Sequence, residues 1–189
     1  MKRLPVEVTG ISGCVPYQGY VVILREQSGQ RMLPIFIGVY EAHNINLLLQ
    51  GVKPARPLTY DFCHQLINAA STKIQNVTVT QLREHTFFAE VELELKDGSI
   101  CFIDARPSDA IAMAVRTESP IFVAENVMNE ASFTGGDVPV EMVEQGEIEQ
   151  KLSSLYKELT SAVENEAFED AAKLRDKIKE LEEEKNKIA

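Results

Sequence analysis

Alternation of apolar and polar residues through the middle of the chain is the feature that most restricts its fold. Residues 74–82 and 87–95 both alternate, which is the pattern of strands with one covered face. The dipeptide Asp97-Gly98 follows, and it is typical of a tight hairpin turn that leads into a further strand at residues 100–103. The sequence therefore predicts antiparallel strand pairing in this region.

Helices are expected between the strand segments of the chain. β-rich segments occur within residues 3–37 and at residues 121–123, while apolar residues recur at helical spacing in three further segments. The expected helices cover residues 39–50, 59–70 and 107–116. Thr59 is the predicted cap of the second helix, and Gly51 suits the end of the first. Because strands are mixed with helices, we expect an α+β fold with mixed, largely antiparallel sheets.

The composition of the chain changes after about residue 147. Residues 132–146 contain two adjacent glycines and a proline, which is typical of a linker. Beyond them the chain has no glycine or proline, and its two apolar stripes are separated at residues 164–166. We therefore expect a folded domain at 1–131, a linker at 132–146 and an antiparallel helical hairpin at 147–189.

Charge and cysteine content restrict the partners and the compartment. The formal net charge of −10 excludes a general attraction to nucleic acid or an anionic membrane, so nucleic-acid binding would need local cations or a bridging metal. No signal-peptide pattern opens the chain, and no segment approaches the roughly 20 apolar residues of a membrane span. Cys14, Cys63 and Cys101 have no CxxC spacing and are expected to be reduced thiols. These features predict a cytoplasmic protein without membrane contact.

Two Arg-Pro dipeptides precede expected helices, and an acid follows each of them. The segments are Arg56-Pro57-Leu58-Thr59-Tyr60-Asp61 and Asp104-Ala105-Arg106-Pro107-Ser108-Asp109. The planar guanidinium of arginine binds phosphate or carboxylate, and carboxylates bind divalent metals or transfer protons. If the two loops meet in the fold, they hold the groups for phosphodiester chemistry. If they lie apart, they are the starts of two well-capped helices.

We assign candidate site residues from these two loops. The candidate catalytic residues are Arg56, Asp61, Asp104, Arg106 and Asp109. The candidate substrate-binding residues are Thr59, Tyr60 and Ser108. Asp104 ends an apolar strand, where we expect its carboxylate to be partly buried and to need a partner. For each residue alone the alternative is structural, because an arginine can pair with a first-turn acid that the helix dipole stabilises.

A divalent metal is a further expected component. The candidate ligands are Glu41, Asp61, Asp104 and Asp109. Three or four oxygen ligands with open positions suit Mg²⁺ or Mn²⁺, which can activate water and stabilise a leaving oxygen. The three histidines show no HExxH or paired-ligand spacing, so no zinc motif is expected.

Three segments of the first domain resemble the bifunctional nuclease (BFN) domain family. They are 32–38 with Glu41-Ala42, 56–61 and 104–112. The likeness extends over roughly residues 3–130 and implies that this domain cleaves RNA and DNA. In the family pattern a histidine often stands where this chain has Tyr60, so a base supplied by that histidine would be absent here.

The C-terminal segment resembles the UVR motif, the helical hairpin of the UvrB and UvrC excision-repair subunits and of some stress-response adaptor proteins. The resemblance rests on Leu155, Leu159 and Ala162, followed by the stretch 168–181. It implies protein–protein docking. The candidate partner-binding residues are Leu152, Leu155, Leu159, Phe168 and Leu174.

Two functions remain open on the sequence alone. The first is a metal-assisted nuclease that acts on RNA and DNA and docks a protein through its hairpin. The second is a non-catalytic ligand-binding or regulatory module linked to a DNA-repair or proteolysis partner, which the acidic charge and the lack of an obvious base favour. In both cases we expect a homodimer or larger, because short strands that are apolar on both faces leave edges to cover.

Overall fold

The structure is a computed structural model that describes residues 2–13, 19–84, 86–135, 148, 151–152, 154–156, 158–163, 165 and 167–188. The chain divides into two compact units. The first unit holds the described residues up to 135, and the second holds those from 148 onward. No helix among these described residues is long and apolar enough to cross a membrane.

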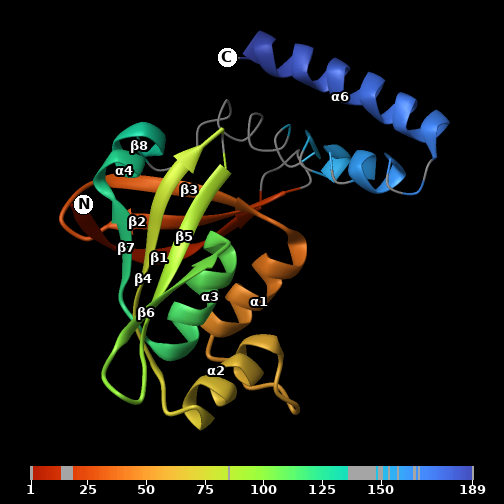
Figure 1. The fold of residues 1–189 in the computed structure, drawn as a ribbon. Helices are drawn as coiled ribbons and strands as arrows, with labels where there is room; N and C mark the ends of the chain where they lie inside the picture. The colour runs from red at the N-terminus through yellow and green to blue at the C-terminus, as the bar shows by residue number, and fades with distance from the viewer. Residues whose placement is uncertain are drawn as a thin grey trace. The chain divides into compact units, whose positions relative to one another are not determined.

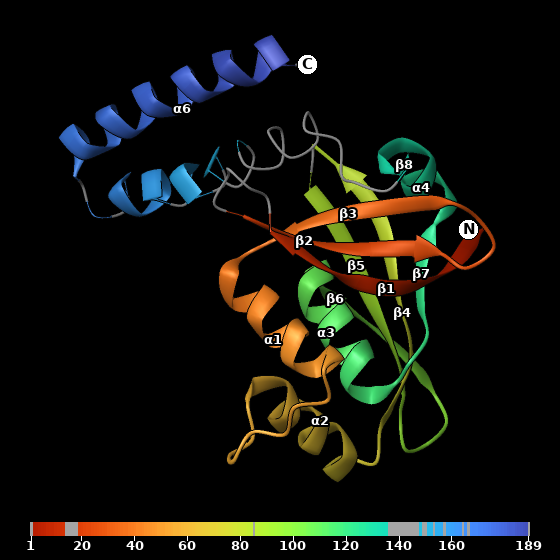
Figure 2. The ribbon, with the colours of Figure 1, turned by 180° about the vertical axis from the view of Figure 1, so that it is seen from behind.

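The first unit is built on one eight-stranded sheet. Its strands are β1 (Arg3–Gly13), β2 (Tyr20–Glu26), β3 (Arg31–Ile37), β4 (Lys73–Arg83), β5 (Thr86–Glu94), β6 (Ile100–Ala105), β7 (Ile121–Ala124) and β8 (Phe133–Thr134). The strand order is β6-β5-β4-β7-β1-β2-β3-β8, and every neighbouring pair is antiparallel except β4 and β7. β1, β2 and β3 cross β4 and β5 at a steep angle (Figures 1 and 2). The predicted α+β fold with a mixed, largely antiparallel sheet is confirmed.

Helices cover one face of this sheet. They are α1 (Val39–Leu49), α2 (Thr59–Ala69) and α3 (Pro107–Thr117), with a short α4 (Glu125–Ala131) after β7. α3 contacts α1, α2, β4 and β5, so it is the central helix of the layer. Figure 1 and Figure 2 both show α1 beside α3, with α2 below them. The bounds lie within a few residues of the three helices that the sequence predicts.

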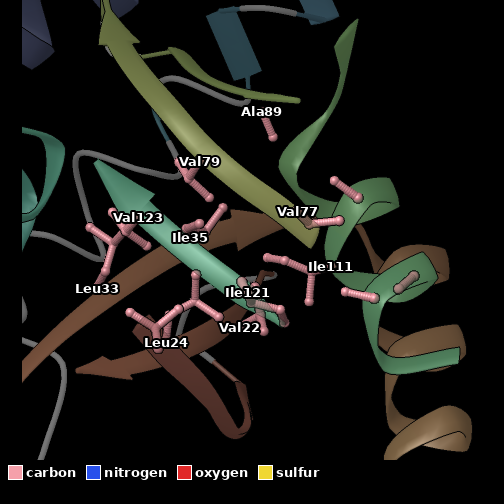
Figure 3. Packing of buried hydrophobic residues seen from close by; sticks show 14 of the residues in the cluster. Val22, Leu24, Leu33, Ile35, Val77, Val79, Ala89, Ile111, Ile121 and Val123 are labelled. Carbon is pink, nitrogen blue, oxygen red and sulfur yellow. The ribbon is translucent and has the colours of Figure 1, made fainter. Parts of the chain in front are cut away.

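A single apolar core lies between the helices and the sheet. Figure 3 shows side chains from β2, β3, β4, β7 and α3 pointing toward one another. Leu24, Leu33, Val77, Ile111 and Val123 are fully buried in this cluster. They come from segments that are far apart in the sequence, so burying them fixes how β1–β3 sit against β4–β6.

β1 runs to Gly13 through a bulge between Val8 and Gly10, and Gly10 has a φ of 156° that few other residues tolerate. The sequence prediction differs from the structure in two places. The predicted linker begins too early, because Phe133 is buried and pairs with Met32 in the sheet; residues 136–146 lie outside the described residues. Thr59 is the first helical residue of α2 instead of its cap, which is Leu58.

The second unit contains the predicted helical hairpin. Residues between 148 and 163 are helical where they are described, and α6 (Phe168–Ile188) follows. Ile148, Leu152 and Ile178 are buried together, and Leu155, Leu159 and Leu181 pack against them. The hydroxyl of Tyr156 donates a hydrogen bond to Glu182 across the pair at 2.7 Å. The side chain of Phe168, one of the predicted partner-binding residues, lies outside the described side chains.

α2 depends on polar contacts to stay on the domain, because none of its residues is fully buried. Tyr60 and Ile67 pack against the core only in part. Asp61 accepts a hydrogen bond from the Leu58 N–H at 3.1 Å and one from Nε of Arg116 in α3 at 2.6 Å. The bond from Leu58, followed by the Arg116 pair, lowers the pKa of the Asp61 carboxyl below its ordinary value.

Replacing Asp61 by asparagine should therefore lower the free energy of unfolding at neutral pH. We expect a loss of about 1–2 kcal/mol. This is the usual contribution of a hydrogen bond to a charged group, lowered because Arg116 is partly exposed to solvent. Because the folded-state pKa is lowered, this stability is present above the unfolded pKa and disappears as the pH falls through the folded pKa. Urea unfolding of both proteins should give a difference that shrinks at acid pH.

Asp104→Asn is the matched control for this measurement. Asp104 is exposed and has no ion pair with any described residue, so its loss should change the unfolding free energy by less than about 0.5 kcal/mol. Equal stability of Asp61→Asn and wild type at neutral pH would show that the contacts of Asp61 do not hold α2 in place.

Candidate functional site

Each helix of the layer begins with an acid in its first turn. Glu41, Asp61 and Asp109 all stand three positions after the cap residue of their helix. The free N–H groups and positive dipole end of a helix stabilise a carboxylate there, so the position has a structural cause before any function is considered. What differs between the three acids is the cation or donor that each one contacts.

Arg106 joins the first turns of α1 and α3. It is the cap residue of α3, with Pro107 at the first helical position. Its Nε donates to Asp109 Oδ2 at 2.7 Å and its Nη2 donates to Asp109 Oδ1 at 3.2 Å. The same Nη2 lies 3.2 Å from Glu41 Oε1 in α1. Two carboxylates from two helices therefore fix the plane of one guanidinium.

Gly38 allows Glu41 to take this position. It is the cap residue of α1, and a Cβ built at this site would collide with the Glu41 carboxylate. Any other residue would require the Glu41 carboxylate to shift, because the added Cβ would overlap with its Oε2. The Ile37-Gly38 sequence at the end of β3 is thus part of the geometry of the cluster.

Tyr60 brings α2 into the same cluster. Its hydroxyl donates a hydrogen bond to Asp109 Oδ1 at 2.8 Å. Burial, followed by this bond and the negative charges of Asp109 and Glu41, raises the pKa of the Tyr60 hydroxyl far above its ordinary value. Tyr60 is therefore a neutral hydrogen-bond donor at any physiological pH.

One side of the Arg106 guanidinium remains open. The side chain of Arg106 is 66% exposed, and its Nη1 donates to no group among the described residues. Hydrogen bonds to Asp109, and then the charge of Glu41, raise the pKa of Arg106 above its ordinary value, so the cation is permanent. The cluster formed by Glu41, Tyr60, Arg106 and Asp109 can thus accept an oxyanion at Nη1.

Asp61 belongs to a different group from this cluster. Its carboxylate is bound to Arg116 in the last turn of α3, which lies seven residues from Asp109 in the sequence. Seven residues correspond to about 10.5 Å along a helix axis. Arg116 was not among the candidates from the sequence, although a cation in the last turn of a helix is a recognised stabilising feature.

Asp104 is exposed instead of partly buried, which corrects the expectation for this residue. It pairs directly with Glu90 of β5, on the sheet face opposite to the one that carries Ala89 and Ala105. Ala89 lies in the core beneath the helices, so Asp104 faces away from them. The apolar run at 100–103 suggested a buried strand. β6 is instead an edge strand, and the side chains of Phe102 and Ile103 are exposed.

The remaining candidates form no hydrogen bond or ion pair with the cluster among the described residues. Arg56 and Thr59 are exposed, and Arg56 forms no ion pair with a described residue. Ser108 is buried in the first turn of α3, so it is not open to a substrate. Of the five candidate catalytic residues, the structure brings only Arg106 and Asp109 into contact, and it adds Tyr60 and Glu41 to them.

The candidate metal ligands do not form one set of ligands. Within the described parts of the chain, no group of three or more His, Cys, Asp and Glu side chains could hold a metal ion. Asp61 is paired with Arg116, and Asp109 already accepts three hydrogen bonds. The donor set therefore does not fit a metal ion held by the protein alone.

Comparison with known proteins shows which family models and which relatives match this chain. The bifunctional nuclease domain model matches residues 22–135, which include β3 and the first turns of α1, α2 and α3, and the UvrB/UvrC motif model matches residues 149–184. An uncharacterised protein of Mycobacterium tuberculosis is 43% identical over 126 residues, which is 67% of this chain and 74% of that protein.

Two plant proteins are also similar. Bifunctional nuclease 1 of Arabidopsis thaliana is 24% identical over 192 residues, covering 88% of this chain and 57% of the plant protein. Bifunctional nuclease 2 of Oryza sativa is 31% identical over 110 residues, covering 56% of this chain and 33% of its own length. Since the domain model matches more than half of the 189 residues, the chain belongs to the bifunctional nuclease domain family and carries a UvrB/UvrC motif after that domain.

Proposed function

We propose that the first unit is a cytoplasmic nuclease that hydrolyses phosphodiester bonds of RNA and DNA at the cluster of Glu41, Tyr60, Arg106 and Asp109. The observation that carries the proposal is the open Nη1 of an exposed arginine whose other nitrogens are fixed by two carboxylates. The plant relatives are named bifunctional nucleases, and this supports the same reaction class here. The chain spans just over half the length of the Arabidopsis protein, so the activity of that whole protein is part of the proposal.

Arg106 is the residue that binds the scissile phosphate in this proposal. Its Nη1 donates to a non-bridging oxygen, while Asp109 and Glu41 keep the guanidinium from rotating. A donor that is already oriented costs no reorganisation when charge develops in the transition state, which is how such groups accelerate a reaction. The N-termini of α1 and α3 add their positive dipole ends at the same place.

Asp109 and Tyr60 act as positioning residues for Arg106. Asp109 accepts hydrogen bonds from two Arg106 nitrogens and from Tyr60, so both of its oxygens are engaged. Tyr60 stays protonated and adds no negative charge that would repel phosphate. The cluster is therefore built to bind and stabilise an anion more than to remove a proton.

Local cations can offset the net charge of −10 near this site. Lys53 and Arg56 lie in the exposed loop before α2, and neither forms an ion pair with a described residue. Their loop leads directly to Tyr60. They would attract the phosphates on either side of the one bound by Arg106.

A regulatory module is the second candidate function. The engaged carboxylates favour it, because a cluster without a free base can bind an anion without cleaving it. In this second function Arg106 binds a phosphorylated ligand, and the hairpin binds a DNA-repair or proteolysis partner. The two candidates differ in whether a bound phosphodiester is broken.

The hairpin is proposed as the part that docks a protein partner. Leu152 is buried in the hairpin, and Leu155 and Leu159 pack against its core, so these residues serve its own folding first. Tyr156 and Val163 are about half exposed on the first helix. We therefore propose that docking uses these two side chains beside the residues assigned from the sequence.

Self-association is proposed for the first unit. Leu58, Phe62 and Leu66 form an exposed apolar stripe at a spacing of four residues on α2. The only acid of α2 is Asp61, which Arg116 neutralises, so like charges do not oppose contact between two copies here. β6 offers a second surface, because it lies at the edge of the sheet that the described residues form and pairs there only with β5.

Replacing Arg106 by glutamine should lower the rate of RNA and DNA cleavage by about 10²–10³-fold, the usual effect of losing one oriented donor to transition-state charge. A fluorescent single-stranded substrate measures the rate. Arg25→Gln is the matched control, because the Arg25 side chain is also exposed, at 52% against 66% for Arg106, but pairs with Glu7 on β1. A wild-type rate in Arg106→Gln would remove the cluster from the reaction, and phosphate binding without cleavage in wild type would favour the regulatory module.

Cleavage is expected to stop in EDTA and to return with Mg²⁺ or Mn²⁺. Mg²⁺ commonly binds through one or two carboxylates together with substrate phosphates, so the absence of a three-ligand set among the described residues does not prevent metal dependence. Asp104→Asn should keep the wild-type rate, because this carboxylate faces away from the helices. Full activity in EDTA would contradict the metal requirement, and a large loss in Asp104→Asn would contradict the placement of the site.

The protein is expected to have a mass above the monomer value of 21.1 kDa at micromolar concentration. Light scattering measures this mass. Phe62→Lys should shift the population toward the monomer, since it places a charge in the middle of the apolar stripe on α2. A monomeric wild type would contradict self-association, and an oligomer indifferent to Phe62→Lys would point to the β6 edge.

A further inference from the structure

Tyr40 is the most exposed large apolar side chain in the part of the chain that the structure describes. It is 83% exposed in the first turn of α1, and Val39 beside it is exposed as well. The Tyr40 side chain takes no part in the core of the domain or in a hydrogen bond with a described residue; its backbone carbonyl accepts a hydrogen bond from the side-chain amide of Asn44 at 2.8 Å. A single exposed apolar residue is ordinary on a protein surface, so its meaning depends on what lies next to it.

The neighbour of Tyr40 is the residue that fixes Arg106. Tyr40 directly precedes Glu41, so their Cα atoms are about 3.8 Å apart, and Glu41 contacts Arg106 Nη2. A second tyrosine lies close by in the sheet, because Tyr20 pairs with Ile37, the last residue of β3 before α1 begins. An exposed aromatic ring and an open guanidinium nitrogen therefore occupy the same end of α1.

A nucleic-acid strand presents both groups that this surface can bind. Arginine takes the phosphate, and an aromatic ring takes the flat face of a base by stacking. In a duplex both faces of each base are already stacked on neighbours, so only an unpaired nucleotide can offer a face to Tyr40. The pairing of cation and ring thus selects single strands, ends and loops over intact duplex.

We propose that Tyr40 is a base-stacking residue and that the site takes single-stranded nucleic acid, with a phosphate on Arg106 and an adjacent base on Tyr40. This inference rests on the proposed function of the Arg106 cluster and adds its substrate class. The ring carries the interaction and the hydroxyl is dispensable. Recognition of this kind is tolerant of sequence, because every base has a face to stack.

Binding of the full-length protein to labelled oligonucleotides tests the proposal. The probes are a single strand of about 12 nucleotides, within the usual site sizes of single-strand binders, with nuclease-resistant phosphorothioate linkages, and the same strand with abasic positions. Tyr40→Ala should weaken binding to the single strand roughly 5- to 150-fold, the range for one stacked base, and should leave binding to the abasic strand unchanged. Tyr40→Phe, which keeps the ring, should restore the affinity.

Phe102→Ala serves as the control for loss of an exposed aromatic ring elsewhere. Phe102 is 60% exposed on β6 and should have no influence on binding. Wild-type affinity in Tyr40→Ala, equal losses on both strands, or a Tyr40→Phe variant as weak as Tyr40→Ala would each overturn the stacking role.

The same series separates this inference from the function on which it rests. Arg106→Gln should weaken binding to both strands, because it removes the phosphate contact. A loss in Arg106→Gln without one in Tyr40→Ala rejects the stacking residue and keeps the phosphate site. A wild-type protein that binds neither strand rejects both.

Discussion

β7 holds the two halves of the sheet together. It pairs antiparallel with β1 at Arg3–Ala124 and parallel with β4 at Val77–Ile121, so the strands on either side form one sheet only through these four residues. Three of the four are buried. The connection from β6 back to β7 must return from the edge of the sheet to its middle, and α3 makes this return across β5 and β4. Because Arg106 and Asp109 stand at the start of α3, this connection also places them beside the start of α1.

The local elements could be predicted from the sequence, because each rests on short-range physics. The Asp97-Gly98 turn, for example, has the expected positive φ of 82° at Gly98 and closes onto Leu95. The position of β7 could not be predicted, because a four-residue apolar strand fits beside many others and only the complete core selects its neighbours. β8 could not be predicted either. Its sequence is typical of a linker, and it forms a strand only because Phe133 is buried against β3 in the folded domain.

The candidate site could be predicted only in part, for a reason visible in the two Arg-Pro loops. Arg106 is itself the cap residue of α3, whereas Arg56 precedes the cap of α2 by two positions. This offset turns Arg106 toward the first turn of its own helix and leaves Arg56 in an exposed loop. The first-turn acids follow the same logic: Asp61 caps the Leu58 N–H, while Asp109 binds side chains. The two Arg-Pro loops are thus similar in sequence, but the position of the cap residue in each loop determines which side chains come into contact.

Asp109 is shared between the guanidinium of Arg106 and the hydroxyl of Tyr60, and this sharing has a thermodynamic consequence. α2 has no fully buried residue, so its attachment to the domain depends in part on contacts of this kind. Any ligand that changes the Asp109–Arg106 contact then changes how firmly α2 is held. By linkage, if a ligand at Arg106 changes the affinity of α2 for a partner by some factor, that partner changes the affinity at Arg106 by the same factor. The surface of α2 and the anion site are thus thermodynamically coupled through Tyr60, which belongs to α2 and contacts Asp109 in the cluster.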